Sequence, residues 1–281
     1  MSTFIHLLLR YSNINGKILP AAEASIHPDN SAFRYGVGLF ETMLVQHGLV
    51  RHMQYHMERL ADGMRRLHFA IPRRFDSTFL LKEVHRTVEK NQLLPLCRVR
   101  LQVFAGSGGV FGPDDVAPQY VIECYPLEPD AISFNINGLV VGTYTESVKC
   151  ADAFSDLKSS NALVYAMAGR YAKANKWNDA LIVNQHGRVI ESVIANLFIV
   201  KGGHIITTPL TEGCIAGVLR RHLLHTVTGI LEQPITEADL LEADEVFLTN
   251  AIRGIRWVGL IGDKRYQNNK SRQLAAEAGL L

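Results

Sequence analysis

Residues 156–161 (DLKSSN) and residues 191–198 (ESVIANLF) decide how the rest of this chain is interpreted. Lys158 in the first stretch stands just before a helix-like run. Glu191 in the second stretch follows residues 184–187 (NQHG), whose composition is typical of a hairpin turn. The chain therefore combines a lysine beside a helix with a glutamate after a hairpin.

A lysine and a carboxylate are the two side chains that pyridoxal phosphate chemistry requires. The lysine amine forms a Schiff base with the cofactor aldehyde. The carboxylate keeps the pyridine nitrogen protonated, so that the ring can accept electrons. Either residue alone is uninformative, because most lysines and glutamates are solvated surface groups.

Several other stretches accompany this pair in a fixed order. They are residues 34–42 (RYGVGLFET), Arg51 with His56 and Arg59-Leu60, residues 217–220 (GVLR), and residues 244–251 (DEVFLTNA). Taken together, the chain resembles the class IV pyridoxal-phosphate enzymes, which include branched-chain aminotransferases, D-amino acid aminotransferases and aminodeoxychorismate lyases. The resemblance covers nearly the whole chain, and several separate motifs in order make it specific.

The mix of antiparallel hairpins and helices predicts two α+β domains, with residues 126–130 (PLEPD) as the linker. The resemblance implies an N-terminal α/β sandwich over residues 1–127 and a C-terminal pseudo-barrel, which binds pyridoxal phosphate, over residues 128–281. It also implies that the cofactor lies in the cleft between the domains, and that the protein is a homodimer.

Hydrophobic periodicity predicts the individual elements. Strands are expected over residues 5–10, 17–20, 38–46, 98–104, 119–125, 132–135, 139–144, 180–184, 188–190, 195–200, 204–207 and 244–249. Helices are expected over residues 54–68, 75–91, 161–175, 215–227, 237–242 and 267–279.

Composition excludes several classes of protein. The formal net charge of +2 is too small to indicate nucleic acid as a partner. No apolar stretch approaches the ~20 residues that span a membrane, and the short apolar run at residues 4–9 predicts a strand rather than a signal peptide. The four cysteines are scattered, which predicts free thiols and a cytoplasmic protein.

The resemblance assigns the cofactor site residue by residue. Lys158 is the Schiff-base lysine and proton shuttle, and its pKa should be depressed by desolvation and by the cationic ring. Glu191 is the partner of the pyridine nitrogen. The phosphate is assigned to the helix N-terminus at Val218 and Leu219, to Arg51, and to Asn250 and Ala251, with Thr249 as an alternative contact.

Substrate recognition is expected on two strands. Arg98 and Arg100 alternate with apolar residues and so share one strand face, and Arg100 matches an arginine near the substrate pocket of branched-chain aminotransferases. A cross-strand ion pair is the structural alternative for these arginines. Phe40 and Thr42 are expected to line the pocket. The expected substrates are an amino acid and a 2-oxo acid.

Departures from the family pattern keep the reaction open. Lyases typically show Arg-Gly-Ser-Gly-Gly-Arg-Gly where residues 105–112 read AGSGGVFG, and Val37 replaces a common aspartate. In contrast, Thr42 and residues 249–255 (TNAIRGI) resemble the lyases. The first hypothesis is an aminotransferase, and the alternative is 4-amino-4-deoxychorismate lyase, which releases pyruvate and 4-aminobenzoate. A third hypothesis is a protein that binds the cofactor without turnover. Selectivity for L- or D-amino acids stays open.

Three other patterns are set aside. The glycines near residues 36–38 and 106–112 lack the strand–GxGxxG–helix context of dinucleotide loops. His52 and His56 have the spacing of metal ligands, but Met53 stands where a zinc protease has glutamate, so no metal is expected. Residues 155–158 fit a Ser-x-x-Lys spacing without its companion motifs.

Overall fold

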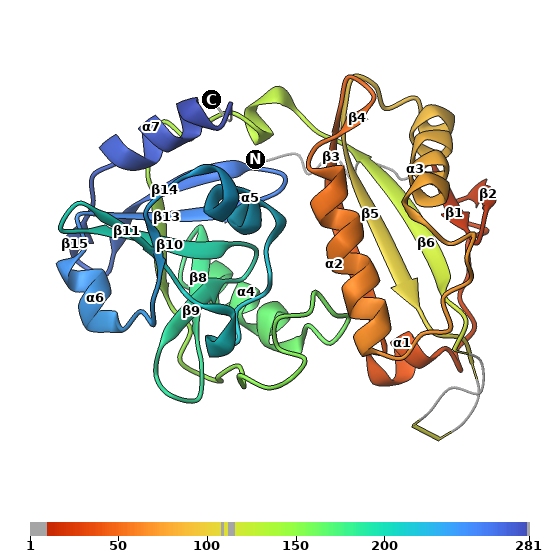
Figure 1. Cartoon of the computed structure of the whole chain (residues 1–281), viewed down its shortest axis with the longest axis horizontal. Coiled ribbons are helices and arrows are strands. Elements are labelled where there is room, and N and C mark those ends of the chain that lie inside the picture. The colour runs from red at the N-terminus through yellow and green to blue at the C-terminus, as the bar shows by residue number, and fades with distance from the viewer. Residues whose placement is uncertain (1–9, 108–109, 112–115, 280–281) are drawn as a thin grey trace. The chain divides into compact units, whose positions relative to one another are not determined.

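The computed structural model describes residues 10–107, 110–111 and 116–279, which divide into two compact units (Figure 1). Unit 1 runs to Pro129 and also includes Lys158–Asn161. Unit 2 comprises Asp130–Leu157 and Ala162–Leu281. Residues 158–161 thus pack with unit 1 although they follow part of unit 2 in sequence. The domain limits 1–127 and 128–281 stay predictions.

Unit 1 is an antiparallel sheet with three helices. Its strands are β1 (Tyr11–Ile14), β2 (Lys17–Pro20), β3 (Gly38–Gln46), β4 (Leu49–Val50), β5 (Leu96–Phe104) and β6 (Gln119–Pro126), in the order β2-β1-β6-β5-β3-β4. Its helices are α1 (Ser31–Tyr35), α2 (Met53–Arg66) and α3 (Ser77–Asn91). Helix α2 packs against β3, and α3 packs against β1, β5 and β6 (Figure 1).

Buried and more exposed residues alternate along most of β5. Val99, Leu101 and Val103 are fully buried, whereas Arg98 is exposed and Arg100 is half-buried. Successive side chains of a strand point to opposite faces, so β5 has one apolar face and one polar face. The polar face predicted for residues 98–104 is confirmed.

Unit 2 is built on a mixed sheet. Its strands are β7 (Leu139–Thr143), β8 (Asp179–Val183), β9 (Val189–Ser192), β10 (Asn196–Lys201), β11 (His204–Thr207), β12 (Ile230–Glu232), β13 (Glu245–Asn250), β14 (Gly254–Ile261) and β15 (Lys264–Arg265). Its helices are α4 (Leu163–Ala174), α5 (Val218–Thr226), α6 (Glu237–Glu242) and α7 (Asn269–Glu277). Short 3-10 turns occur at η1 (Pro129–Ala131) and η2 (Leu210–Glu212).

Six of these strands close into a barrel. Strands β10, β13, β14, β7, β8 and β9 are hydrogen-bonded in that order, and β9 pairs again with β10. The closing pair is Glu191 opposite Asn196. The α+β class and the C-terminal pseudo-barrel predicted for the chain are confirmed. None of the described helices is both long and apolar enough to cross a membrane.

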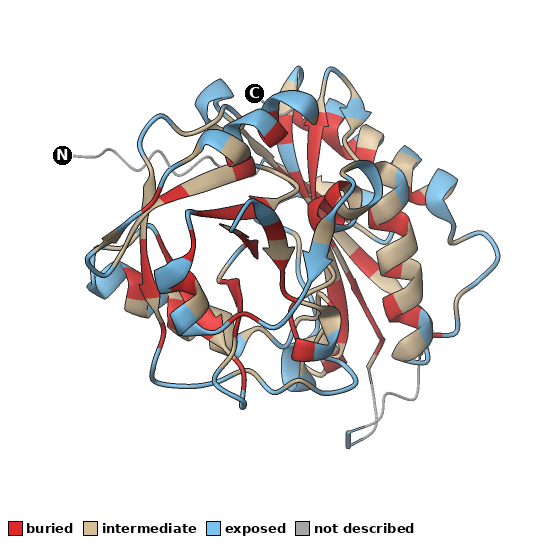
Figure 2. Ribbon diagram, turned by 60° about the vertical axis from the view of Figure 1, so that its left-hand side comes forward, coloured by how far each residue is buried: buried red, intermediate tan, exposed pale blue. Residues whose placement is uncertain are grey.

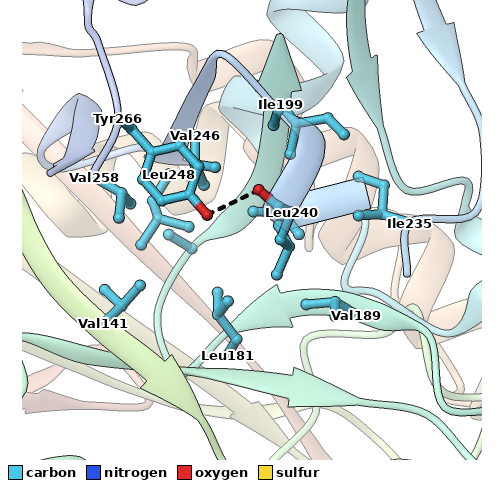
Figure 3. Close-up of a cluster of buried hydrophobic side chains, with 13 residues drawn as sticks. Val141, Leu181, Val189, Ile199, Ile235, Leu240, Val246, Leu248, Val258 and Tyr266 are labelled. Atoms are coloured by element: carbon cyan, nitrogen blue, oxygen red, sulfur yellow. Dashed lines mark hydrogen bonds between the residues drawn. The ribbon is translucent and has the colours of Figure 1, made fainter. Parts of the chain in front are cut away.

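All six barrel strands contribute to one buried apolar cluster (Figure 3). Val141, Leu181, Val189, Val246 and Val258 are among its members, and α6 adds Leu240, whose carbonyl accepts a hydrogen bond from Tyr266. The alternate residues of the strands pack under α5 and α7 or under α4. Long buried runs therefore mark these strands, whereas the helices alternate between buried and exposed residues (Figure 2).

Two of the strand predictions need correction or qualification. Of residues 5–10, residues 5–9 lie outside the described part of the chain, and the strand that pairs with β2 is β1, which follows the predicted strand, at residues 11–14. The turn is confined to Asn15 and Gly16, both at positive φ. The strand predicted over residues 132–135 is wrong. There the Asn135 side chain bonds the backbone of Trp257 and replaces a strand ladder.

Candidate active site

Lys158 is held by main-chain pairing with β3 in unit 1. The Phe40 amide donates to the Lys158 carbonyl at 2.9 Å, and the Ser160 amide donates to the Gly38 carbonyl at 2.8 Å. A Cβ on Gly38 would lie 2.7 Å from the Ser160 hydroxyl oxygen, which is closer than side chains tolerate. Glycine at position 38 therefore lets the lysine segment approach the strand.

Two cations share the aromatic ring of Phe40. The Lys158 Nζ lies 4.4 Å from the ring centroid, and the Arg100 Cζ lies 3.9 Å from it. The Arg100 guanidinium also donates to the Gln102 side-chain oxygen at 2.6 Å, and the Gln102 amide donates to the Ser160 hydroxyl. We call Phe40, Arg100, Gln102, Lys158 and Ser160 the Phe40 face.

The other residues predicted in unit 1 fall in different surroundings. Thr42 is half-buried and lies opposite Arg100 across the β3–β5 ladder. Arg98 is exposed, and its guanidinium lies over the Tyr125 ring at 4.6 Å. Arg51 stands between β4 and α2, where it donates to the Gln46 side chain at 3.2 Å. Arg100 therefore joins Lys158 on the Phe40 face, whereas Arg98 stacks on another ring.

The opposite face of β3 carries a buried ionic cluster. The Glu41 carboxylate contacts His56 Nδ1 at 2.5 Å and accepts from Arg59 Nε at 2.8 Å. Burial would raise the pKa of Glu41, but the charges and hydrogen bonds of Arg59 and His56 outweigh it and lower the pKa to about 2. Glu41 is therefore ionised at neutral pH.

Glu191 in unit 2 is nearly saturated with hydrogen bonds. Its Oε1 accepts from Lys149 Nζ at 2.8 Å and from the Tyr165 hydroxyl at 2.7 Å, and its Oε2 accepts from the Ile215 amide at 3.0 Å. We call Glu191, Lys149, Tyr165 and Ile215 the Glu191 network. A carboxylate has about four acceptor positions. Among the described residues, one position on Oε2 is therefore left for another donor.

Burial raises the pKa of Tyr165, and the negative charge of Glu191 raises it further. Tyr165 therefore remains a phenol that donates to the carboxylate. Our sequence reasoning missed both Lys149 and Tyr165 as neighbours of Glu191. They come from the loop after β7 and from α4, and no local motif links these segments.

The N-terminus of α5 begins beside the Glu191 network. Gly217 is its N-cap residue and makes no side-chain cap, so the amides that follow it at the buried residues Val218 and Leu219 have no partner within the helix. A Cβ on Gly217 would lie 1.7 Å from the Asn196 side-chain oxygen, so any other residue there would displace the Asn196 side chain. The Ile215 amide, two residues before Gly217, donates to Glu191, so the carboxylate lies close to this end of the helix.

Thr249 lies opposite Asn196 in the β10–β13 ladder. Its hydroxyl is buried and has no hydrogen-bond partner among the described residues. The neighbouring Asn250 side chain accepts from the amides of Ile252 and Arg253 at 3.0 and 2.8 Å, so it shapes the turn that contains Ala251. Thr249 is thus the side chain here with an unused polar group.

Comparison with known proteins gives the family. The model of the family described as amino-transferase class IV matches residues 38–261, which is most of the chain. The chain belongs to the class IV aminotransferase family. Membership of class IV implies pyridoxal phosphate as the cofactor.

The similar class IV proteins include both lyases and aminotransferases. The aminodeoxychorismate lyase of Vibrio harveyi is 26% identical over 230 residues, covering 80% of this chain and 83% of the relative. The branched-chain-amino-acid aminotransferase of Salmonella typhimurium is 24% identical over 254 residues, covering 85% and 81%. The structure of a branched-chain aminotransferase from Thermoproteus uzoniensis with norvaline superposes with a TM-score of 0.86 at 22% identity, covering 95% and 92%. That likeness establishes the fold.

The residues of unit 2 fit the class IV cofactor. Glu191 keeps one acceptor position for a ring N–H, and α5 presents uncapped amides where an anion is favoured. Thr249 adds a buried hydroxyl without a partner among the described residues. Glu191 matches a protonated ring nitrogen, and the α5 amides and Thr249 match a phosphate.

Proposed function

We propose that this chain is a pyridoxal-phosphate-dependent aminotransferase that moves an amino group between an amino acid and a 2-oxo acid. Lys158 binds the cofactor covalently and carries the α-proton. Glu191 accepts the N–H of the pyridine ring. The phosphate is assigned to the Val218 and Leu219 amides, to Arg51, and to the turn at Asn250 and Ala251, with Thr249 as a further donor.

When bound, pyridoxal phosphate supplies an aldehyde that takes up amino groups and a ring that accepts electrons. The protein residues supply binding, orientation and proton transfer. The Lys158 amine would move a proton between the substrate α-carbon and the C4′ carbon of the cofactor, which is the proton movement that amino transfer requires. The Glu191 carboxylate favours the protonated form of the ring nitrogen through a charge-assisted hydrogen bond.

The observation that carries the aminotransferase proposal is the Phe40 face. An α-amino acid presents a nitrogen and a carboxylate that are separated by one carbon. Lys158 is the group that must exchange with the substrate nitrogen, and Arg100 shares the Phe40 ring with it. A guanidinium binds a carboxylate in bidentate fashion, so Arg100 is suited to hold the substrate carboxylate near the lysine.

Aminodeoxychorismate lyase is the second candidate. Thr42 and residues 249–255 favour it, and Thr42 lies opposite Arg100 on the strand that carries Phe40. Against it, Ala105 and Val110 stand where the lyases typically have arginines. The aminotransferase proposal therefore comes first.

The first experiment asks which lysine carries the cofactor. The protein is loaded with pyridoxal phosphate, reduced with borohydride, digested and mapped by mass spectrometry. We expect the phosphopyridoxyl group on Lys158. Lys149 is the informative competitor, because it is a mostly buried lysine that contacts Glu191. A label on Lys149, or no specific label, would refute the assignment of Lys158.

The second experiment separates the two reactions. The loaded protein is mixed with a panel of L- and D-amino acids, and absorption reports conversion to the amine form of the cofactor. An aminotransferase is converted by its amino donor and regenerated by a 2-oxo acid. A lyase instead releases pyruvate from aminodeoxychorismate without any amino acceptor. Pyruvate release together with inertness towards every amino acid would overturn the aminotransferase proposal.

A further inference from the structure

Lys149 is the nearest cation that the structure shows for the Glu191 carboxylate. Its Nζ lies 2.8 Å from Glu191 Oε1 and 2.5 Å from the Tyr165 hydroxyl. The Lys149 side chain is 11% exposed and the Glu191 side chain 3% exposed, so this ion pair is largely shielded from water. A charge that is removed from water is costly unless it is paired, so Lys149 and Glu191 stabilise each other.

The backbone around Lys149 holds it in place. The Lys149 amide donates to the Val183 carbonyl at 3.0 Å, and Lys149 forms a parallel bridge with Asn184 just after β8. The Lys149 Nζ also lies 5.1 Å from the centroid of the Tyr165 ring. Both ends of the side chain are therefore anchored, the backbone to the barrel and the ammonium to α4 and β9.

The hydrogen bonds to Oε1 of Glu191 leave only Oε2 open to a further donor. Lys149 and Tyr165 occupy both acceptor positions of Oε1, and the Ile215 amide occupies one position of Oε2. Any further donor must therefore approach Oε2. The carboxylate cannot rotate without losing three hydrogen bonds, so its remaining acceptor has one fixed direction.

The geometry points to Lys149 as a positioning residue that fixes the Glu191 carboxylate and directs its Oε2 at the ring nitrogen of the cofactor. This inference rests on the proposed function of Glu191. It adds a second residue to the control of the ring, because the Lys149 ammonium fixes the carboxylate that the ring N–H meets. Lys149 thereby sets how strongly Glu191 holds the ring proton.

The first test uses the protein without cofactor. The free energy of unfolding is measured in urea for wild type, Lys149→Met, Glu191→Gln and the double variant. We expect Lys149→Met to lower the folding constant about tenfold or more beyond its effect in the E191Q background, because the two side chains are coupled. Lys173→Met is the control, since Lys173 is an exposed lysine of α4. Additive effects of the two changes would overturn the inference.

The second test measures cofactor affinity and the absorption maximum of the bound cofactor. Lys149→Met should weaken pyridoxal phosphate binding about tenfold and move the absorption maximum, because Glu191 loses a charged hydrogen bond that orients it. Lys149→Arg restores the cation and should return both towards wild type. Tyr165→Phe removes one hydrogen bond but no charge, and it replaces Lys149→Met if that variant does not fold.

These outcomes distinguish the inference from the proposed function. If wild type binds no pyridoxal phosphate, the proposed function fails, and the unfolding cycle still reports whether Lys149 holds Glu191. If wild type binds the cofactor but Lys149→Met matches it in affinity and absorption, the inference fails and the proposed function stands. A Lys149→Arg protein that behaves like Lys149→Met would also contradict a role for the positive charge.

Discussion

The Glu191 network and the Phe40 face hold their charged groups in different ways. Every polar atom of the Glu191 carboxylate is fixed by hydrogen bonds of 2.7 to 3.0 Å from three different segments. On the Phe40 face, two cations rest on one aromatic ring, and Arg100 adds one neutral hydrogen bond to Gln102. Cation–π contacts of this kind are worth about 0.5–2 kcal/mol, which is less than a set of charged hydrogen bonds.

This difference matches the two tasks of the proposed enzyme. A cofactor partner must keep one geometry through every cycle, and a closed hydrogen-bond network provides it. Groups that exchange partners with a substrate must instead be held weakly enough to move. Arg100 meets this requirement in part, because its contact with the Phe40 ring costs little to break when a carboxylate binds. Four predictions test this comparison.

The largest expected effect is at the exchanging lysine. Lys158→Ala should reduce amino transfer by about 10³-fold or more, because both proton transfer and covalent attachment are lost. Its urea unfolding midpoint is measured alongside, so that a loss of turnover is separated from a loss of folding. Lys173→Ala serves as the control. Substantial turnover by Lys158→Ala would mean that the catalytic lysine lies elsewhere.

The buried side of β3 should show the behaviour of a fixed network. The pKa of Glu41 is lowered from 4.5 to about 2, so the folded protein binds its proton less tightly than the unfolded chain does. The resulting stability is fully present above about pH 4.5 and is lost as pH falls towards 2, by roughly 3 kcal/mol in total. Urea unfolding between pH 5 and 3 measures this loss.

Glu41→Gln should flatten that acid dependence, because the group that titrates is gone. Glu123→Gln is the control, since Glu123 lies half-buried on β6. An equally steep loss of stability in Glu41→Gln would place the acid-sensitive group elsewhere.

Arg100→Leu and Arg98→Leu should differ in their effect on KM for the amino donor. We expect KM for the amino donor to rise about tenfold to a hundredfold, because a bidentate partner of the carboxylate is lost. Cofactor affinity should not change. Arg98→Leu is the matched variant and should change KM only a few fold, since Arg98 is exposed and stacks on Tyr125. Equal effects of both variants would show that Arg100 has no special role in recognition.

Much of this molecule could be predicted from local sequence. The alternation of β5, the helical period of α2 and the glycine before α5 each depend on neighbours in the chain, and the structure confirms them. Strand β14 was missed because Gly254, Arg256 and Gly259 interrupt its apolar pattern. The predicted strand at 132–135 was wrong because a side chain, Asn135, replaces the backbone ladder.

The surroundings of Glu191 could not be predicted from sequence. Lys149 and Tyr165 contact the Glu191 carboxylate at the point where the barrel closes, at the pair formed by Glu191 and Asn196. The Glu191 network joins four separate segments of the chain, and no spacing rule connects them. The motif residues were found because each lies in a short stretch that resembles the family. Their partners Lys149 and Tyr165 were not predicted, because their positions depend on how distant segments pack together.

The smallest expected effect is at Thr249, which belongs to neither region. Thr249→Val keeps the shape but removes a buried hydroxyl that has no partner among the described residues. Stability should stay level or rise slightly, whereas pyridoxal phosphate affinity should fall about tenfold as one donor to the phosphate is lost. Thr207→Val is the converse control, because the Thr207 hydroxyl donates to the Leu197 carbonyl at 2.7 Å. That variant should lose stability and keep cofactor affinity. If Thr249→Val instead destabilises the protein and binds cofactor normally, the hydroxyl serves the fold, and the phosphate relies on the α5 amides and arginine.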